Sequence, residues 1–184
     1  MPDFTLIPPE ENARRLNAGP GPAALAAASA AWDHLADELD TAADGIEGAL
    51  TTLTEAWQSA AATQMTQAAA PYLVWLRDAA DRAGLTARLA AHARMAYRRA
   101  DYLMVSPREI AANIAWRKQL HQTNQLGQNT HAIAIAEADY QQYWTRNATA
   151  MENYRDDVAL VMQRVRPFRE MSTQTGLVLN GVAV

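Results

Sequence analysis

The chain has 184 residues, a formal net charge of −4 and no cysteine. This length fits one domain or one elongated bundle, and the acidic balance offers no basic footprint for nucleic acid. Without thiols the chain has no disulfide, no thiol catalysis and no thiolate metal site. Apolar residues make up 49% of the sequence, much of it alanine, and the abundance of Ala, Leu, Arg, Glu and Gln predicts an all-α protein.

The N-terminal stretch MPDFTLIPPEENARR has neither the basic nor the apolar segment of a cleaved signal peptide. No window of about 18 apolar residues is present to span a membrane. If the protein leaves the cell, we expect a route that does not use a standard cleaved signal.

Residues 1–9 contain three prolines and are expected to be extended. Pro9 is well placed as the first residue of a short helix over about 10–17, with glutamates in its first turn. The stretch AGPGP (18–22) ends that helix, and Pro22 opens the next one.

A seven-residue apolar repeat over residues 22–57 predicts a long helix with a narrow packing seam. At ~1.5 Å per residue this helix would be roughly 50 Å long. The repeat fills a first seam position with Leu25, Trp32, Leu39, Ile46 and Leu53, and a second with Ala28, Leu35, Ala42, Ala49 and Ala56.

A second long helix is predicted over about 60–104, with a seam made mostly of alanine. Alanine permits close approach of two helices but buries little area per contact. Pro71 lies inside this pattern, where it should kink the helix or leave one carbonyl unpaired.

Packing these two helices only against each other leaves a stripe of larger apolar side chains partly exposed. Such a stripe on a soluble protein usually marks a partner surface. The alternative is that later helices cover it and close a four-helix bundle, and periodicity alone leaves both open. The residues concerned are Leu50, Trp57, Leu73, Leu85, Leu89 and Met95.

Ser106 is expected to cap a third helix over about 107–124. The polar cluster TNQLGQNT (123–130) then forms a bend, and a last long helix runs from there to about Pro167. Residues 169–184 are interpreted as a flexible tail, and their apolar, non-periodic end indicates a chain cut from a longer one.

Several collinear stretches over about residues 4–168 resemble the mycobacterial PPE family, which takes its name from the tripeptide found here as Pro8-Pro9-Glu10. We therefore interpret residues 1–168 as a PPE domain and the tail as the start of a variable C-terminal region. The matching stretches are IPPEENARRLNAGPGPAALAAASAAW (7–32), APYLVWL (70–76), the region of Tyr97, IAAN (110–113), TNQLGQNTHAIAIAEADYQQYW (123–144) and RPF (166–168).

The resemblance implies about five helices in antiparallel hairpins, which complete a four-helix bundle with a PE-family protein. It also implies export of the pair by a type VII (ESX) secretion system, after an EspG-type chaperone has kept it soluble. The protein would be cytoplasmic while chaperone-bound, and then secreted or associated with the cell surface or envelope. The implied PE-facing residues are Leu25, Trp32, Leu35, Leu39, Ile46, Leu50, Leu53, Leu73 and Leu76.

In the family, a hydrophobic pair at the tip after the third helix enters the chaperone's pocket. The matching positions here are Gln125 and Leu126, so only one of the two is apolar. Burial of a leucine contributes about 1.5–3 kcal/mol, and the neighbouring amides would add hydrogen bonds. The expected chaperone-binding set is Asn124, Gln125, Leu126, Gly127 and Gln128.

The alternative for this loop is that its amides cap the two helix ends, with Gly127 at positive φ. Both roles fit different residues. We assign docking to Leu126 and capping to Asn129 and Thr130.

The family also has a WxG motif between the two long helices, where this chain reads Trp57-Gln58-Ser59. Ser59 can cap the following helix, so the secretion-signal-like turn is expected to form. Tyr97 and Asp101 match the YxxxD/E signal expected on the PE partner, but they lie inside a helix, and we interpret Tyr97 as a core residue.

No pattern in the sequence argues for catalysis, a metal site or a cofactor. The four histidines have no metal-binding spacing, and His121 and His131, which flank the bend, are interpreted as surface residues without a nearby carboxylate. No nucleophile or phosphate-loop motif is present. The five tryptophans are interpreted as packing residues, and Asn147 as a seam residue that fixes register.

Three functions from different classes fit the sequence. The first is a non-enzymatic secreted subunit that needs a PE partner, and it predicts poor solubility alone and rescue by that partner. The second is a cell-envelope transport component acting as a PE–PPE pair, and it predicts liposome binding or leakage. The third is a homo-oligomeric coiled coil, and it predicts a folded homodimer at low concentration.

Overall fold

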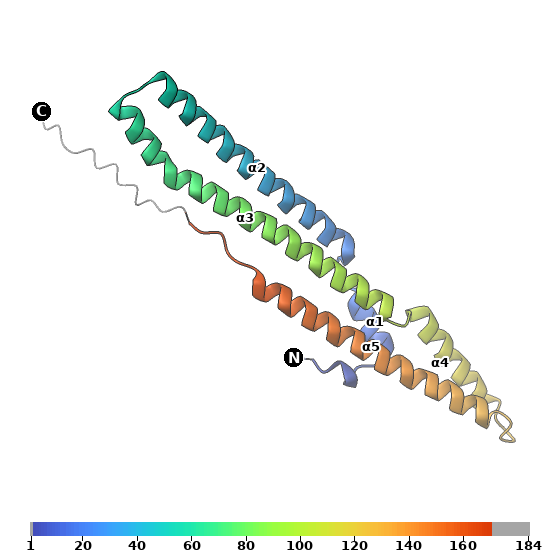
Figure 1. The fold of residues 1–184 in the computed structure, drawn as a ribbon. Coiled ribbons are helices and arrows are strands. Elements are labelled where there is room, and N and C mark those ends of the chain that lie inside the picture. The colour runs from blue at the N-terminus through green and yellow to red at the C-terminus, as the bar shows by residue number, and fades with distance from the viewer. Residues whose placement is uncertain (1, 171–184) are drawn as a thin grey trace, which may run out of the picture. The chain divides into compact units, whose positions relative to one another are not determined.

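The computed structural model describes residues 2–170, and this range is helical without a β-strand (Figure 1). The all-α prediction is confirmed. Most of the predicted tail, residues 171–184, lies outside the described residues. In chain order the elements are η1 (Phe4–Leu6), α1 (Pro9–Asn17), α2 (Gly21–Ala56), α3 (Ala60–Leu103), α4 (Pro107–Gln122) and α5 (Thr130–Arg164).

The predicted helices are found close to their expected bounds. Ser106 caps α4, because its Oγ accepts a hydrogen bond from the Glu109 N–H at 3.2 Å. Helix α3 continues through Pro71. The expected extended start is wrong at η1, where the Asp3 carboxylate accepts the Thr5 N–H at 2.9 Å and so closes a local turn.

The described chain divides into two compact units, and α2 and α3 contribute to both. Unit 1 contains residues 2–27 and 90–164, and unit 2 contains residues 28–89 and 165–170.

The core of unit 1 joins η1 and α1 to the end of α3, the start of α4 and the middle of α5. Tyr97 is buried there, as predicted, and its ring packs edge-on against Tyr154 with the centroids 6.1 Å apart. The buried members are Phe4, Ala13, Leu16, Tyr97, Ala100, Met104, Val105, Ile110, Ala148, Ala150 and Met151.

Asn147 is fully buried in α5, and its side chain links two other segments of unit 1. Its Oδ1 accepts the Val105 N–H at 2.7 Å, and its Nδ2 donates to the Pro9 carbonyl at 2.9 Å. One amide therefore holds the start of α1 and the junction between α3 and α4 against α5. Because buried backbone groups without a partner are costly, this position is set by hydrogen bonding as well as by packing.

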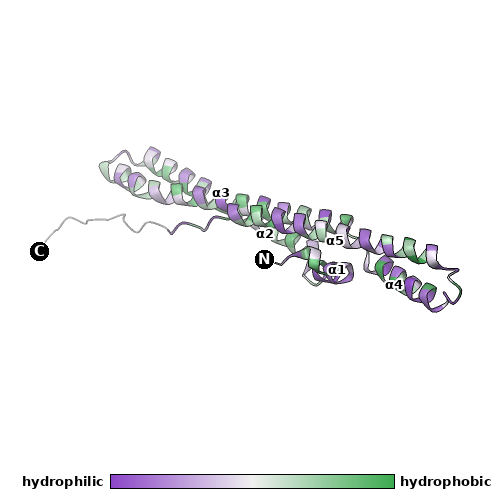
Figure 2. Cartoon of the chain, turned by 90° about the horizontal axis from the view of Figure 1, so that it is seen from below, coloured by the Kyte–Doolittle hydropathy of each residue, from purple (hydrophilic) through white to green (hydrophobic). Residues whose placement is uncertain are grey.

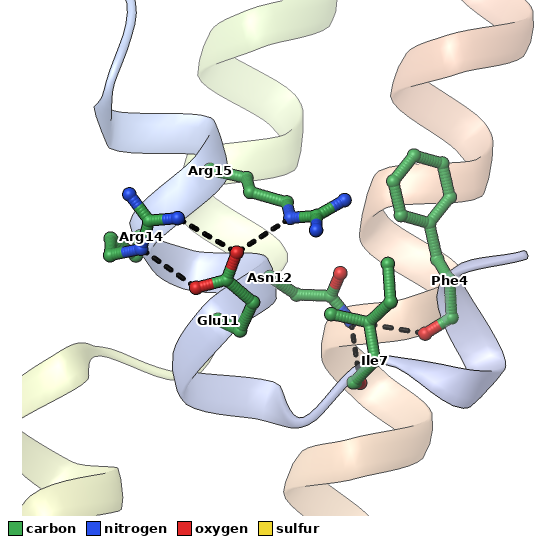
Figure 3. A network of polar contacts seen from close by, with 6 residues as sticks. All are labelled: Phe4, Ile7, Glu11, Asn12, Arg14 and Arg15. Atoms are coloured by element: carbon green, nitrogen blue, oxygen red, sulfur yellow. Dashed lines mark hydrogen bonds and ion pairs between the residues drawn. The ribbon is translucent and has the colours of Figure 1, made fainter. Parts of the chain in front are cut away.

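A second buried amide organises the N-terminal segment (Figure 3). The Nδ2 of Asn12 donates to the carbonyls of Phe4 and Ile7, both at 3.1 Å. Pro9 is buried as the first residue of α1, and the Glu10 carboxylate accepts the Tyr140 hydroxyl at 3.1 Å. In this structure the proline-rich tripeptide thus builds the start of α1 and attaches it to α5.

On the exposed side of α1, Glu11 pairs with both Arg14 and Arg15 (Figure 3). Its two carboxylate oxygens accept from the two Nε atoms, each at 2.7 Å. Hydrogen bonds from Arg14 and then Arg15 lower the pKa of Glu11 to about 2.

We expect Asn147→Ala to lower the free energy of unfolding by about 2–4 kcal/mol, because it leaves the buried Val105 N–H without its partner and removes the second hydrogen bond, to the Pro9 carbonyl. The matched control is Asn153→Ala, an exposed position on the same helix, where the change should stay within about 0.5 kcal/mol. Urea unfolding followed by circular dichroism measures both. Equal effects of the two substitutions would contradict the role given to Asn147.

The carboxyl of Glu11 should titrate near pH 2 rather than at its ordinary value of 4.5. Because the folded-state pKa is depressed, the stabilisation by this pair is present above about pH 4.5 and is lost as the pH falls to about 2. Carboxyl NMR measures the midpoint directly. Glu11→Gln should remove the part of the acid sensitivity that falls in this window, and a midpoint near 4.5 would show that the pair does not form.

Candidate functional site

In unit 2, α2 and α3 lie antiparallel along a seam of small side chains (Figure 1). The Ser29 hydroxyl of α2 donates to the Ala87 carbonyl of α3 at 2.9 Å. Further along, a Cβ placed on Gly84 would lie 3.9 Å from the Cβ of Ala36. Small residues permit this close approach of the two backbones.

The predicted second seam position of α2 is wrong at Ala42, Ala49 and Ala56, which are exposed. The inward row is instead Ser29, Ala36, Ala43 and Leu50, one residue further along the chain. In a helix with a seven-residue repeat, every lengthwise row of side chains recurs with the same period. The repeat alone therefore does not determine which row packs against the neighbouring helix. The row of smaller side chains faces α3, since it allows the closer contact.

The row beside the inward one carries the larger apolar side chains of α2. Because its members stand four positions before or three positions after a member of the inward row, they all lie on one side of it. All of them are half-buried, and all were predicted to face a partner: Leu25, Trp32, Leu39, Ile46 and Leu53.

The other predicted partner-facing residues divide into two groups. Leu35 and Leu73 are half-buried. Leu50 and Leu76 are only 8% and 3% exposed, so their side chains pack within the hairpin and offer no partner surface. The expected exposure of Leu50 and Leu89 is therefore wrong, because the hairpin buries both side chains by itself.

Helix α3 adds Met65, Tyr72 and Trp75 to the same side of the hairpin, at helical spacing. Met65 and Tyr72 are exposed, and the Tyr72 and Trp75 rings are stacked with their centroids 5.8 Å apart. We call this surface of unit 2 the apolar face, and it consists of Trp32, Leu39, Ile46, Leu53, Met65, Tyr72 and Trp75.

The opposite side of the hairpin is charged and satisfied within the chain. Arg77 of α3 contacts Asp40, Asp44 and Glu47 of α2 at 3.6, 2.7 and 2.9 Å. Hydrogen bonds from Asp44 and then Glu47 raise the pKa of Arg77. Along both helices hydrophobic and hydrophilic residues alternate (Figure 2). On α2, the large apolar row and the carboxylates that contact Arg77 lie on different sides of the inward row.

The turn between α2 and α3 forms as expected from its serine. The Ser59 Oγ accepts the Ala62 N–H at 3.2 Å and so caps α3. Trp57 is 65% exposed beside it, so the expected packing role is wrong for this tryptophan. It is also wrong for Trp116, which is 49% exposed in unit 1.

The loop between α4 and α5 in unit 1 presents Leu126, whose side chain is 94% exposed. Gly127 has the expected positive φ, at 78°. The Leu126 N–H donates to the Gln128 Oε1 at 2.9 Å, and the Gln128 amide donates back to the Thr123 carbonyl.

The remaining amides of this loop also bond within it. The Asn124 Oδ1 accepts the Asn129 N–H at 2.8 Å, and the Asn129 Nδ2 donates to the Leu120 carbonyl at 3.0 Å, at the end of α4. Thr130 donates to the Gly127 carbonyl at 2.8 Å. Of the five residues predicted to bind a chaperone, Asn124 and Gln128 therefore use their side chains to shape the loop, while Gln125 and Leu126 are exposed.

Below the loop, Glu137 of α5 pairs with Arg117 of α4, which also lies over the Tyr140 ring at 4.6 Å. The hydrogen bond from Arg117 is the main reason that the pKa of Glu137 is lowered. His121 Nε2 lies 3.7 Å from the same carboxylate, which corrects the expectation that the histidines have no carboxylate nearby. These contacts hold α4 and α5 together next to the loop that carries Leu126.

Within residues 2–170, no group of three or more metal-ligating side chains comes together. Over the same range, no helix combines the length and the apolar character needed to cross a bilayer.

Comparison with known proteins agrees with the resemblance read from the sequence. The family model described as "PPE family" matches residues 3–166. The uncharacterized PPE family protein PPE29 of Mycobacterium tuberculosis is 43% identical over 168 residues, which cover 91% of this chain and 40% of that protein. PPE18 of the same organism is 40% identical over 188 aligned residues, covering 100% and 48% of the two chains.

PPE44 of Mycobacterium tuberculosis is 42% identical over 171 residues, covering 92% of this chain and 44% of that protein. The chain thus spans less than half the length of these curated relatives. Because the family model covers nearly all of the described residues and these relatives align over nine-tenths of the chain or more, the protein belongs to the PPE family.

Proposed function

We propose that this chain is a non-enzymatic interaction subunit that pairs with a PE-family protein through the apolar face of unit 2. The pair is kept soluble by an EspG-type chaperone at the loop between α4 and α5, and is exported by an ESX type VII secretion system. The observation that carries the proposal is the sorting of side chains on the hairpin, apolar on one face and ion-paired on the other.

The apolar face has the chemistry of a helix-docking surface. Its residues repeat every seven positions along α2, the spacing at which a partner helix meets one row of side chains. The charged face needs no partner, because Arg77 already contacts three carboxylates of α2. A large apolar side chain contributes about 1.5–3 kcal/mol when it goes from exposed to fully buried, so each half-buried residue of this row has up to about half of that still to gain from a partner helix.

The loop between α4 and α5 suits recognition by a chaperone for a different reason. Its internal hydrogen bonds fix the backbone on both sides of Leu126, so little ordering entropy is lost when the leucine enters a pocket. Gln125 stands where the family has a second hydrophobic residue, and its free amide can contribute to the choice of chaperone.

The location of the protein follows from these partners. It is cytoplasmic while bound to the chaperone, and it is secreted or associated with the cell surface or envelope after export. None of the three relatives described above is named as an enzyme, and the proposal needs no cofactor.

Co-expression with candidate PE-family proteins, followed by size exclusion and light scattering, tests the pairing. We expect aggregation of the chain alone and a 1:1:1 complex with the PE protein and the chaperone. Leu39→Asp with Ile46→Asp should abolish the pair, because it buries unpaired charges. The control Thr41→Asp adds a charge at an exposed position of the same helix and should leave the pair intact.

A soluble pair that carries both Leu39→Asp and Ile46→Asp would refute the apolar face as the partner surface. A stable monomer or homodimer of the unmodified chain would remove the need for a partner and would favour the coiled-coil alternative.

Leu126→Arg should weaken chaperone binding about ten- to hundredfold, as expected for loss of a buried leucine, and should leave PE pairing unchanged. Gln125→Leu restores a hydrophobic pair and should strengthen binding. Gln142→Arg, at an exposed position of α5 outside the loop, is the matched control. Calorimetric titration of the pair with chaperone measures all three, and unchanged affinity of Leu126→Arg would show that the chaperone binds elsewhere.

A further inference from the structure

Residues 165–170 lie against the hairpin of unit 2, and we call them the C-terminal strap. The Pro167 carbonyl accepts from Arg82 Nη1 at 2.7 Å, and the Arg169 carbonyl accepts from the Trp75 indole N–H at 2.9 Å. Between them, the Phe168 ring is stacked on Trp32 with the centroids 5.8 Å apart and the planes at 19°. The sequence predicted that the last helix runs to about Pro167, whereas α5 ends at Arg164.

Trp32, Trp75 and Arg82 hold residues 167–169 through the ring stack and the two hydrogen bonds, and we call this group of three side chains the notch. Arg82 and Trp75 donate hydrogen bonds to the carbonyls of Pro167 and Arg169, which are two positions apart. The Trp32 ring stacks on the side chain of the residue between them. Alternate side chains of an extended peptide point in opposite directions, so this spacing selects an extended segment with an aromatic residue at its centre.

The donors of the notch are held in place without the strap. Arg82 is fixed by Asp78, whose Oδ2 accepts from its Nε at 2.7 Å. The hydrogen bond from Arg82 also lowers the pKa of Asp78. Trp75 is supported by its stack with Tyr72. A site whose groups are already oriented loses little entropy when it is filled.

The notch lies on the apolar face, because Trp32 and Trp75 are members of it. Trp32 continues the row of Leu39, Ile46 and Leu53, so a helix that follows this row along its full length must cover the ring on which Phe168 lies. The ring stack and the two hydrogen bonds of the strap lie at Trp32, Trp75 and Arg82, at one end of the row that continues through Leu39, Ile46 and Leu53.

We propose that the notch is a peptide-binding site whose occupant in the unpaired chain is the C-terminal strap, and that a helix of the PE-family partner displaces the strap when it docks. This inference rests on the proposed function. The strap then covers one end of the apolar face before pairing and leaves the other end open as the place where the partner first makes contact.

The exposure of the strap supports displacement rather than permanent packing. Residues 165–170 are all exposed, so few contacts hold them besides the two hydrogen bonds and the stack. An exchange between two occupants requires only that the partner bind the face more favourably than the strap does.

The absence of cysteine from the sequence makes the exchange measurable at low concentration. Glu170→Cys, labelled with bimane, places a fluorophore beside the Trp75 contact, where tryptophan quenches it. Trp75→Phe in the same labelled chain removes both the quenching ring and the donor to the Arg169 carbonyl, and it should abolish the quenching. We expect quenching in the chain alone, its loss on addition of the PE-family protein retained in the co-expression test, and its loss in Phe168→Ala without any partner.

The affinity for the same PE-family protein is the second readout. Phe168→Ala removes the competing stack and should tighten binding about two- to tenfold. Val165→Ala, which removes another exposed apolar side chain of the strap, is the matched control and should leave the affinity unchanged.

The outcomes separate the two proposals. Absence of quenching in the chain alone overturns the notch as the strap's binding site. Quenching that persists in the pair, with unchanged affinity of Phe168→Ala, overturns displacement while the pairing itself stands. If the PE-family protein binds neither version, the proposed function fails and displacement fails with it, while the quenching of the chain alone still reports whether the strap occupies the notch.

Discussion

The close approach of α2 and α3 along Ser29, Ala36 and Gly84 is the constraint from which the surface of unit 2 follows. Where two helices meet through small side chains their backbones come close together, and little room remains at those levels for a second row of large side chains; the leucines that do lie inside, Leu50 and Leu76, are buried further along the hairpin. The larger residues of α2 are therefore placed beside the seam, where one hairpin can cover only half of each. An alanine-rich seam thus makes a stable pair of helices and an incomplete core at the same time, which is the physical origin of the apolar face.

In unit 1 the important contacts are at the connections between helices, where buried amide side chains hold the backbone of neighbouring segments together. Asn12 and Asn147 each use a buried amide to tie backbone groups of different segments together, at the start of α1 and at the junction of α3 with α4. The loop beyond α4 applies the same device at the surface, through Asn124, Gln128 and Asn129. Amides suit this work since one side chain both donates and accepts. The side chain of Leu126 takes no part in these hydrogen bonds. It is exposed on a loop whose backbone is held by its neighbours.

The sequence was sufficient for the helices and their ends, since proline, serine caps and the change of period act locally at Pro9, Ser106 and Gly127. It was insufficient for the phase of the seam. The rows of Leu39 and Ala43 have the same period, and only the distance between two backbones decides which one faces inward. It was also insufficient for the amides of the loop, because hydrogen bonds such as that from Asn129 to Leu120 join positions whose pairing depends on the bend itself. The strap was missed for a third reason: Phe168 continues the spacing of α5, and nothing local to it indicates a ring of α2 as its partner.

The strap and the apolar face are linked by an energetic requirement. A surface broad enough to hold a partner is also a surface on which the unpaired chain aggregates, so any segment that covers part of it reversibly lowers that risk. A segment that is to be displaced must bind through few contacts. To lower the tendency to aggregate, it must also cover the largest aromatic rings of the face. Residues 167–169 meet both conditions, since they hold to the hairpin through two carbonyls and one ring and lie on Trp32 and Trp75. The contact between the strap and these rings in the unpaired chain is thus weak, because it consists of few interactions. Most of the favourable free energy of pairing must then come from burial of Leu39, Ile46 and Leu53 of α2.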